Sequence, residues 1–537
     1  MVDMNVPNAD EHWWRDAVIY QVYVRSFADS DGDGVGDLAG ITARLPHLQA
    51  LGVDALWITP FYTSPQHDHG YDVADYCDVD PLFGDLAAAD ALVARAHELG
   101  LRVIVDLVPN HSSSEHPWFK AALGAAPGSP ERARFLFRTG RDGGALPPNN
   151  WASVFGGPAW TRVGDTDQWY LHLFDSTQPD FDWRNPEVGD LFEGILRFWL
   201  DRGVDGFRVD VAHGLFKEES LRDQALEGGS APTSGQVNAD HSMVSRDLQD
   251  EPMWDQPEVH DVYRRWAKIL DEYGADRMAV AEAWTQTPSS MAAFVRPDEL
   301  DQAFNFAWLL AEWSAAAFAD VITDTLAAVQ PVGSAPTWVL SNHDVVRHPT
   351  RYGGGAVGLA RARAATLAML ALPGASYIYQ GEELGLEQAD VPAPDRQDPS
   401  WFRTGEVGRD GCRVPLPWDG TEPPYAFGPG AGQPWLPQPL DWAELTAATQ
   451  EGRAGSTLEF YRAALTARRS VLAGLGADVE MLSPPALGDG VLAFVRGDVT
   501  VVLNAGSTSV PLPAGKVVIA SGPVSGELPP DTAVWLR

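Results

Sequence analysis

The chain has 537 residues, more than one ordinary domain, although barrel folds with insertions reach this length. It carries 74 acidic against 38 basic residues, a formal net charge of −36, and such a surface repels nucleic acids and anionic membranes. Hydrophobic residues make up 45% of the chain, enough for a packed core, yet no apolar run approaches membrane-spanning length.

The first residues, MVDMNVPNADEHWW, have neither a basic start nor an apolar stretch, so we predict no signal peptide. Nothing in the positions of the two cysteines, Cys77 and Cys412, requires a disulfide bond. Together these features favour a cytoplasmic protein, monomeric or homodimeric, with no nucleic-acid or membrane partner.

Four aspartates crowd the segment DSDGDGVGDL, residues 29–38. The segment matches the first half of an EF-hand loop, but position twelve is Gly40 instead of the required glutamate. A hard cation could still be wrapped by carboxylates and one backbone carbonyl, and the predicted ligands are Asp29, Asp31, Asp33, Val35 and Asp37. The alternative is a solvated acidic turn whose aspartates bond their own backbone.

Short apolar, β-branched runs alternate with helical patterns along most of the chain. Eight such runs occur, at residues 17–27, 54–61, 102–111, 206–213, 278–284, 302–308, 337–344 and 376–383. The clearest amphipathic helices between them cover 86–100 and 186–203. Eight strands that alternate with helices predict a (β/α)8 TIM barrel, an α/β fold.

Two segments depart from this alternation. A polar, Pro/Gly-rich stretch after the third strand predicts an inserted subdomain, and a period-two pattern at the C-terminus predicts an antiparallel β-sandwich domain. The predicted boundaries are 1–111 and 180–471 for the barrel (domain A), 112–179 for the insertion (domain B) and 472–537 for the C-terminal domain (domain C). A further irregular stretch, 217–256, follows the fourth strand.

Acidic residues close three of the predicted strands. Asp210, Glu282 and Asp344 follow the fourth, fifth and seventh runs, and active sites of such barrels form where the strands end. One carboxylate of this kind is more often a helix cap, but three at one rim suit glycoside hydrolysis. We expect Arg208 to keep Asp210 ionised, and apolar neighbours to raise the pKa of Glu282.

The motifs VDLVPNH (105–111), GFRVDVAH (206–213), AEAW (281–284) and LSNHD (340–344) resemble the signature regions of the alpha-amylase family of glycoside hydrolases. QPDFDW (178–183) resembles that family's fifth region. The resemblance implies a retaining mechanism with carboxylates about 5–5.5 Å apart. It also implies site roles: a nucleophile at Asp210, a general acid/base at Glu282, a transition-state stabiliser at Asp344, and sugar contacts from His111, Arg208 and His343.

The start of the chain and DHGYDVADY (68–76) resemble the alpha-glucosidase and oligo-1,6-glucosidase branch. The resemblance implies that Asp68 pairs with Arg413 of RDGCRVPLPW (409–418) and closes the site around one terminal glucose, with Tyr71 stacked under the sugar. A surface ion pair is the plainer alternative. The resemblance also implies that the loop at 29–38 holds a structural calcium or magnesium ion.

Linkage preference stays open. In the family, valine after the nucleophile, here Val211, accompanies α-1,6 preference, but the following residues differ from the usual pattern and Val211 could simply pack. We expect an exo-acting alpha-glucosidase that acts on small oligosaccharides or alpha-glucosides. The alternatives are a transglucosidase or disaccharide-converting enzyme and, less favoured because all three acids are present and no membrane segment is seen, a non-catalytic transporter-associated heavy chain.

Overall fold

The computed structural model describes residues 12–224, 251–285, 287–430, 432–482 and 488–537. The N-terminal segment judged for a signal peptide falls mostly outside these ranges, as does most of the irregular stretch at 217–256. Within the ranges, no helix combines the length and the hydropathy that a bilayer crossing requires. Cys77 and Cys412 are both free thiols.

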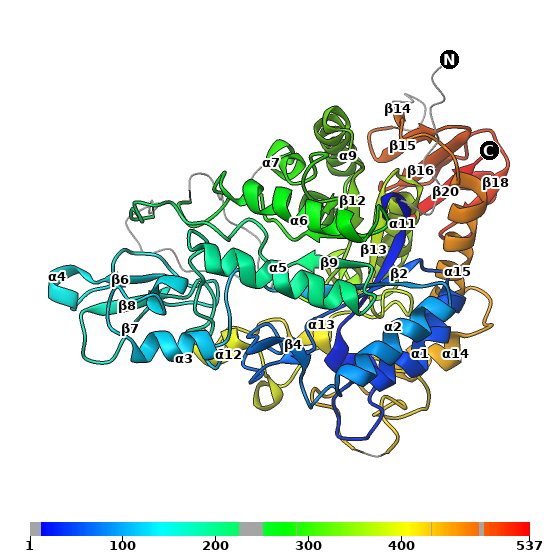
Figure 1. The fold of residues 1–537 in the computed structure, drawn as a ribbon. Helices are drawn as coiled ribbons and strands as arrows, with labels where there is room; N and C mark the ends of the chain where they lie inside the picture. The colour runs from blue at the N-terminus through cyan, green and yellow to red at the C-terminus, as the bar shows by residue number, and fades with distance from the viewer. Residues whose placement is uncertain (1–11, 225–250, 286, 431, 483–487) are drawn as a thin grey trace.

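The eight predicted strands all form, and they build one parallel barrel (Figure 1). Neighbouring strands are hydrogen-bonded in the order β11-β10-β9-β5-β2-β1-β13-β12. A parallel bridge between Phe304 and Thr337 joins the two end strands. The strands are β1 (Val18–Val22), β2 (Ala55–Ile58), β5 (Arg102–Leu107), β9 (Gly206–Val209), β10 (Met278–Ala281), β11 (Gln302–Ala303), β12 (Thr337–Val339) and β13 (Ala375–Tyr379).

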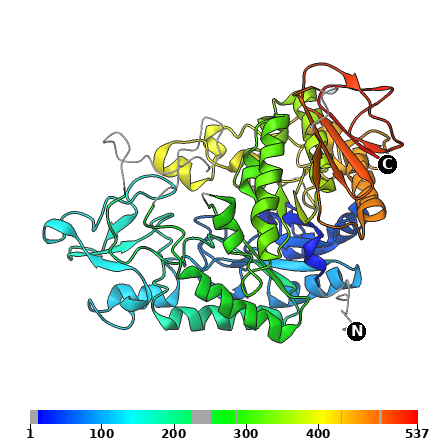
Figure 2. The same cartoon turned by 90° about the horizontal axis from the view of Figure 1, so that it is seen from above.

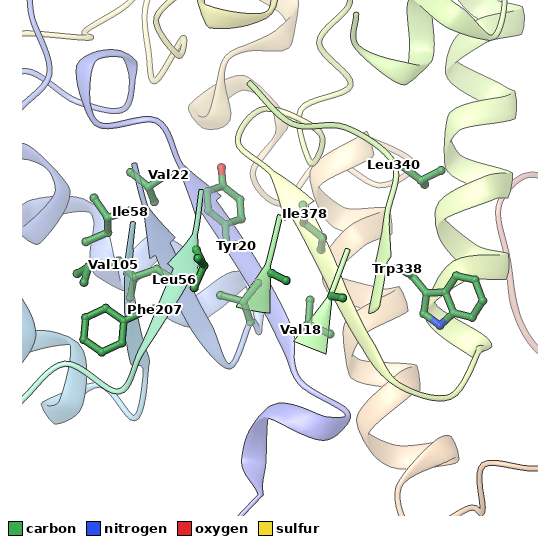
Figure 3. Packing of buried hydrophobic residues seen from close by; sticks show 14 of the residues in the cluster. Val18, Tyr20, Val22, Leu56, Ile58, Val105, Phe207, Trp338, Leu340 and Ile378 are labelled. Carbon is green, nitrogen blue, oxygen red and sulfur yellow. The ribbon is translucent and has the colours of Figure 1, made fainter. Parts of the chain in front are cut away.

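Successive side chains of each strand enter two different cores, because strand residues alternate between faces. Ile19 lies with Trp57 in the cluster that fills the barrel. Its neighbours Val18 and Tyr20 belong to the larger cluster between strands and helices, where Figure 3 shows them beside Ile378. Both faces of the strands are therefore buried, which explains their continuous apolar runs.

Helices pack around the barrel, and several begin at caps that the sequence supplies. Asp37 and Asp85 accept hydrogen bonds from the backbone N–H groups of Gly40 and Ala88, and so fix the starts of α1 and α2. The larger helices are α1 (Leu38–Leu51), α2 (Leu86–Glu98), α5 (Pro186–Asp201), α6 (Val259–Tyr273), α9 (Ala315–Val329), α11 (Gly355–Ala371) and α15 (Thr457–Ala467). The shorter ones are α3 (Pro117–Gly124), α4 (Arg141–Gly144), α7 (Pro288–Ala293), α8 (Phe306–Leu310), α10 (His348–Arg351), α12 (Pro399–Thr404), α13 (Asp410–Arg413) and α14 (Ala447–Gln450).

The inserted segment after β5 forms a separate three-stranded antiparallel sheet that extends to one side of the barrel (Figure 1). Its strands are β6 (Phe137–Thr139), β7 (Trp160–Arg162) and β8 (Gln168–Leu171). Its apolar cluster, which contains Trp151 and Phe155, also takes in Val211 from the end of β9. The insertion therefore packs directly against the rim where the strand-end acids lie.

The C-terminal part forms two antiparallel sheets with an apolar cluster between them. Trp535 donates a hydrogen bond to the Leu367 carbonyl of α11 and so joins this domain to the barrel, beside which it lies in Figure 2. The strands are β14 (Glu480–Leu482), β15 (Val491–Arg496), β16 (Val499–Asn504), β18 (Val517–Ala520) and β20 (Thr532–Leu536) in one sheet, and β17 (Val510–Pro511) and β19 (Glu527–Leu528) in the other.

Candidate active site

One guanidinium group gathers the acidic side chains at the C-terminal end of the barrel. Arg208 Nη1 lies 2.5 Å from Asp210 Oδ1 and 2.9 Å from Asp106 Oδ1, and Arg208 Nη2 lies 3.4 Å from Glu282 Oε2. Arg208 and Asp106 are register neighbours on β9 and β5, which explains their contact. The structure thus brings the predicted nucleophile and the predicted acid/base onto a single cation.

The pKa of Asp210 does not follow the sequence-based expectation. Burial raises the pKa of Asp210 well above its ordinary value, and the neighbouring Glu282 and Asp106 carboxylates add to the rise, while Arg208 opposes it. Arg208 lowers this pKa, as predicted, but burial and the neighbouring carboxylates together outweigh it. The proton on Asp210 is therefore lost at a higher pH than on an ordinary aspartate.

Glu282 follows β10 and lies almost completely buried. Burial raises its pKa, the direction that its apolar neighbours predicted. Its Oε1 accepts a hydrogen bond from Trp284 Nε1 at 2.7 Å, and its Oε2 accepts one from the Val211 backbone N–H at 2.7 Å. Val211 reaches this position with φ of 46°, a left-handed conformation that is rare for a β-branched residue, while its side chain packs in the cluster of the inserted segment.

Asp344, after β12, is the acid that the charges around it keep ionised. Burial alone would raise its pKa, but His343 and the neighbouring arginines outweigh burial and hold the pKa below its ordinary value. Two of these arginines bond the same carboxylate oxygen: Arg409 Nη1 lies 3.1 Å from Asp344 Oδ1, and Arg413 Nη2 lies 2.9 Å from it. Asp344 is therefore a permanent negative charge at the rim.

The predicted ion pair between Asp68 and Arg413 is wrong in its partner. Asp68 Oδ1 bonds Arg409 Nη2 at 2.8 Å, whereas Arg413 turns to the His343 carbonyl and to Asp344. The two arginines lie one helical turn apart at α13 and so share one face of the helix, but Arg409 reaches Asp68 while Arg413 lies farther along and reaches Asp344. Burial raises the pKa of Asp68 to about 6 against the opposing charge of Arg409.

Three aromatic or imidazole side chains fill the space between these charges. Tyr71 stacks on His343 with ring centroids 5.3 Å apart and an interplanar angle of 7°, and its hydroxyl lies 2.7 Å from His343 Nε2. Burial lowers the pKa of His111 to about 4 and that of His343 well below its ordinary value, so both rings are neutral at pH 7. Neutral imidazole rings can form hydrogen bonds in the site without adding positive charge beside its carboxylates.

Several residues of the site were missed by sequence reasoning. Asp106 lies inside a strand run, and Asp398 and Arg409 immediately precede α12 and α13. Their roles depend on tertiary contacts, such as the 2.6 Å bond between Arg409 Nε and Asp398 Oδ2. Lys217 Nζ is buried 2.8 Å from Asp180 Oδ2 and 2.7 Å from Asn110 Oδ1, which ties the loop after β9 to the base of the inserted segment. The family's R-x-P pattern selects Arg413 and gives no signal for Arg409.

The acidic loop after β1 brings together part of the predicted ligand set. Single carboxylate oxygens of Asp29, Asp31 and Asp37 lie within 4.8 Å of one another, and three such oxygens suit a hard cation such as calcium or magnesium. Asp33 lies outside this group, and its Oδ1 accepts the Val35 N–H at 2.7 Å. Asp29 and Asp37 also accept backbone hydrogen bonds, as the alternative of a self-bonded turn requires.

Residues 21–473 match the family described as "Alpha amylase, catalytic domain". The chain is 39% identical over 496 residues to a "Probable alpha-glucosidase" of Rhizobium meliloti (strain 1021), covering 91% of this chain and 86% of the relative. It is 33% identical to an "Oligo-1,6-glucosidase" of Parageobacillus thermoglucosidasius, covering 85% and 84%. The solved alpha-glucosyl transfer enzyme XgtA superposes with a TM-score of 0.86 at 36% identity, covering 98% of this chain and 99% of XgtA.

Proposed function

The chain belongs to the alpha-amylase family of glycoside hydrolases, and from this premise we propose that it is a retaining, exo-acting alpha-glucosidase that releases terminal α-D-glucose from small oligosaccharides or alpha-glucosides. One observation carries the proposal: Asp210 and Glu282 share the Arg208 guanidinium, while Asp68, Asp344 and Arg409 form a second charged group at the same rim. Two carboxylates on one cation suit a double displacement at one anomeric carbon.

In the first half-reaction, an Asp210 oxygen attacks the anomeric carbon as the bond to the leaving oxygen breaks, and Glu282 gives its proton to that oxygen. In the second, the ionised Glu282 takes a proton from water, whose oxygen attacks the same carbon and frees Asp210 from the ester. Asp344, held ionised by its arginines, accepts hydrogen bonds from sugar hydroxyls. The two inversions leave the released glucose in the α configuration.

The pair Asp68–Arg409 supports the exo-acting part of the proposal. Both side chains are almost completely buried, and their ion pair is 2.8 Å long. A buried ion pair across the end of the site would leave no path for a sugar chain beyond the terminal glucose. The linkage that follows this glucose is not fixed by these residues.

The function is tested with maltose, isomaltose, sucrose and p-nitrophenyl α-glucoside as separate substrates. We expect free glucose as the main product, released from the non-reducing end and first detected by NMR as the α anomer. Rapid internal cleavage of starch would contradict the exo-acting part, and release of the β anomer would contradict retention.

Transfer to another sugar is the second candidate, favoured by the superposition on XgtA, an alpha-glucosyl transfer enzyme. The chain also superposes on the trehalulose synthase MutB of Pseudomonas mesoacidophila MX-45, with a TM-score of 0.85 at 29% identity. Transfer shares every step with hydrolysis except the hydroxyl that attacks the intermediate. Oligosaccharides in excess of free glucose in the same assay would establish it.

We further propose that the acidic loop holds a structural calcium or magnesium ion through Asp29, Asp31 and Asp37. The ion would neutralise crowded carboxylates next to α1, whose start Asp37 caps. Treatment with EDTA is expected to remove bound metal and to lower the melting temperature, and Asp31→Asn to weaken metal binding without removing the cap. Unchanged metal content and melting temperature after chelation would leave the self-bonded turn as the better description.

A further inference from the structure

Both oxygens of the Glu282 carboxylate have a nearby N–H donor that carries no charge. Trp284 Nε1 donates to Oε1 and the Val211 backbone N–H donates to Oε2, each at 2.7 Å. The charged contact is longer, since Arg208 Nη2 lies 3.4 Å from Oε2. The shortest hydrogen bonds to the proposed acid/base, Glu282, therefore come from uncharged donors, the Trp284 indole and the Val211 backbone.

The Trp284 indole is held in place by a second aromatic ring. The indole stacks on the ring of Phe306, the first residue of α8, with ring centroids 3.6 Å apart and an interplanar angle of 10°. The Asn305 side chain caps α8 by accepting a hydrogen bond from the backbone N–H of Trp308, and this cap fixes the start of the helix at Phe306. The position of the indole nitrogen is thus set by barrel elements rather than by Glu282 itself.

We propose that the indole N–H of Trp284 is the positioning donor that holds Glu282 ready as a base, and so sets the balance between the two half-reactions. The proposal rests on the function proposed above, in which Glu282 gives a proton in the first half-reaction and takes one in the second. A donated N–H stabilises the ionised carboxylate and competes with its protonation. Trp284 therefore favours the second half-reaction over the first.

Loss of this donor has a kinetic signature that loss of packing does not have. Trp284→Phe keeps an aromatic ring to stack on Phe306 but removes the N–H. Because burial already raises the pKa of Glu282, removal of a donor that opposes burial should raise it further. The alkaline limb of kcat/KM, which reports this acid in the free enzyme, should then move upward by roughly one pH unit.

The experiment compares the pH profiles of the full-length enzyme, Trp284→Phe and Trp308→Phe with p-nitrophenyl α-glucoside and with maltose. Trp308 is a matched control, because it lies on α8 and its buried Nε1 has no hydrogen-bond partner among the described residues. We expect the upward shift only in Trp284→Phe. We also expect kcat of that variant to fall more with p-nitrophenyl α-glucoside, whose good leaving group makes the second half-reaction limiting.

An unshifted alkaline limb in a folded Trp284→Phe variant, or an equal shift in Trp308→Phe, would overturn the inference. Should Trp284→Phe fail to fold, Phe306→Leu takes its place, because it removes the ring that holds the indole but keeps the indole N–H. We then expect a smaller upward shift of the alkaline limb. An unshifted limb in this variant counts against the inference. Failure of the proposed function looks different: the unmodified enzyme would then release no glucose from any of these substrates.

Discussion

Replacement of Asp210 by asparagine is expected to lower kcat by roughly 10⁴-fold or more while the protein stays folded. The amide keeps the shape of the side chain and can still accept a hydrogen bond from Arg208, but it cannot form the glucosyl ester. Because three buried carboxylates share that guanidinium, removal of one charge also relieves repulsion. Stability should therefore hold or rise as activity is lost. Initial rates and the melting temperature measure both.

Asp205→Asn is the matched control at the other end of the same strand. Asp205 precedes β9 and bonds His97, Arg102 and the Val103 N–H, so its role is structural. We expect Asp205→Asn to lower the melting temperature while kcat stays close to that of the unmodified enzyme. An active Asp210→Asn variant, or equal loss of kcat in both variants, would refute the role given to Asp210.

Arg409→Lys is expected to cause the second large loss, in kcat/KM for all terminal glucosides. Three different nitrogens of Arg409 bond three buried carboxylates, those of Asp68, Asp344 and Asp398. A single ammonium cannot span all three, and each lost hydrogen bond to a charged group is worth about 1.5–3 kcal/mol. Loss of two such bonds at the site predicts a fall in kcat/KM of roughly 10²-fold or more.

Arg409→Met separates charge from geometry, because it leaves the three carboxylates without this cation. Removal of one partner of a buried ion pair costs about 3–5 kcal/mol, so this variant should be markedly less stable than Arg409→Lys. Arg396→Lys, on the other side of α12, is the control: Arg396 donates to the Val391 carbonyl and stacks over Trp401, with no carboxylate partner among the described residues. If Arg409→Lys kept kcat/KM within twofold of the Arg396→Lys value, the three-way contact would have no functional weight.

The barrel could be predicted because each of its strands is buried on both faces, so apolar runs mark strands without help from tertiary structure. The three acids could be predicted for a related reason. Parallel strands end at one rim, so residues that close different strands meet although they are far apart in sequence, as Asp210 and Glu282 do on Arg208.

The parts that could not be predicted depend on distances between loops and on burial. The R-x-P pattern of the family points to Arg413, which precedes Val414 and Pro415, yet the folded chain places Arg409 against Asp68. The raised pKa of Asp210 reflects burial among other carboxylates, whereas sequence spacing reveals only the nearby Arg208. Val211 has a left-handed backbone that directs its N–H at Glu282. Nothing in the sequence indicates this conformation, because β-branched residues rarely adopt it.

The three contacts of Arg409 also bear on how this enzyme could be redesigned. In the proposed function Asp68 closes the end of the site and Asp344 binds the sugar, yet one side chain holds both of them and is itself anchored by Asp398. A substitution that opened the Asp68 side to longer chains would release Arg409 and thereby displace Asp344. Substrate length and turnover are therefore not independent traits in this scaffold, and a broader substrate range calls for paired substitutions at Asp68 and Asp398, selected together.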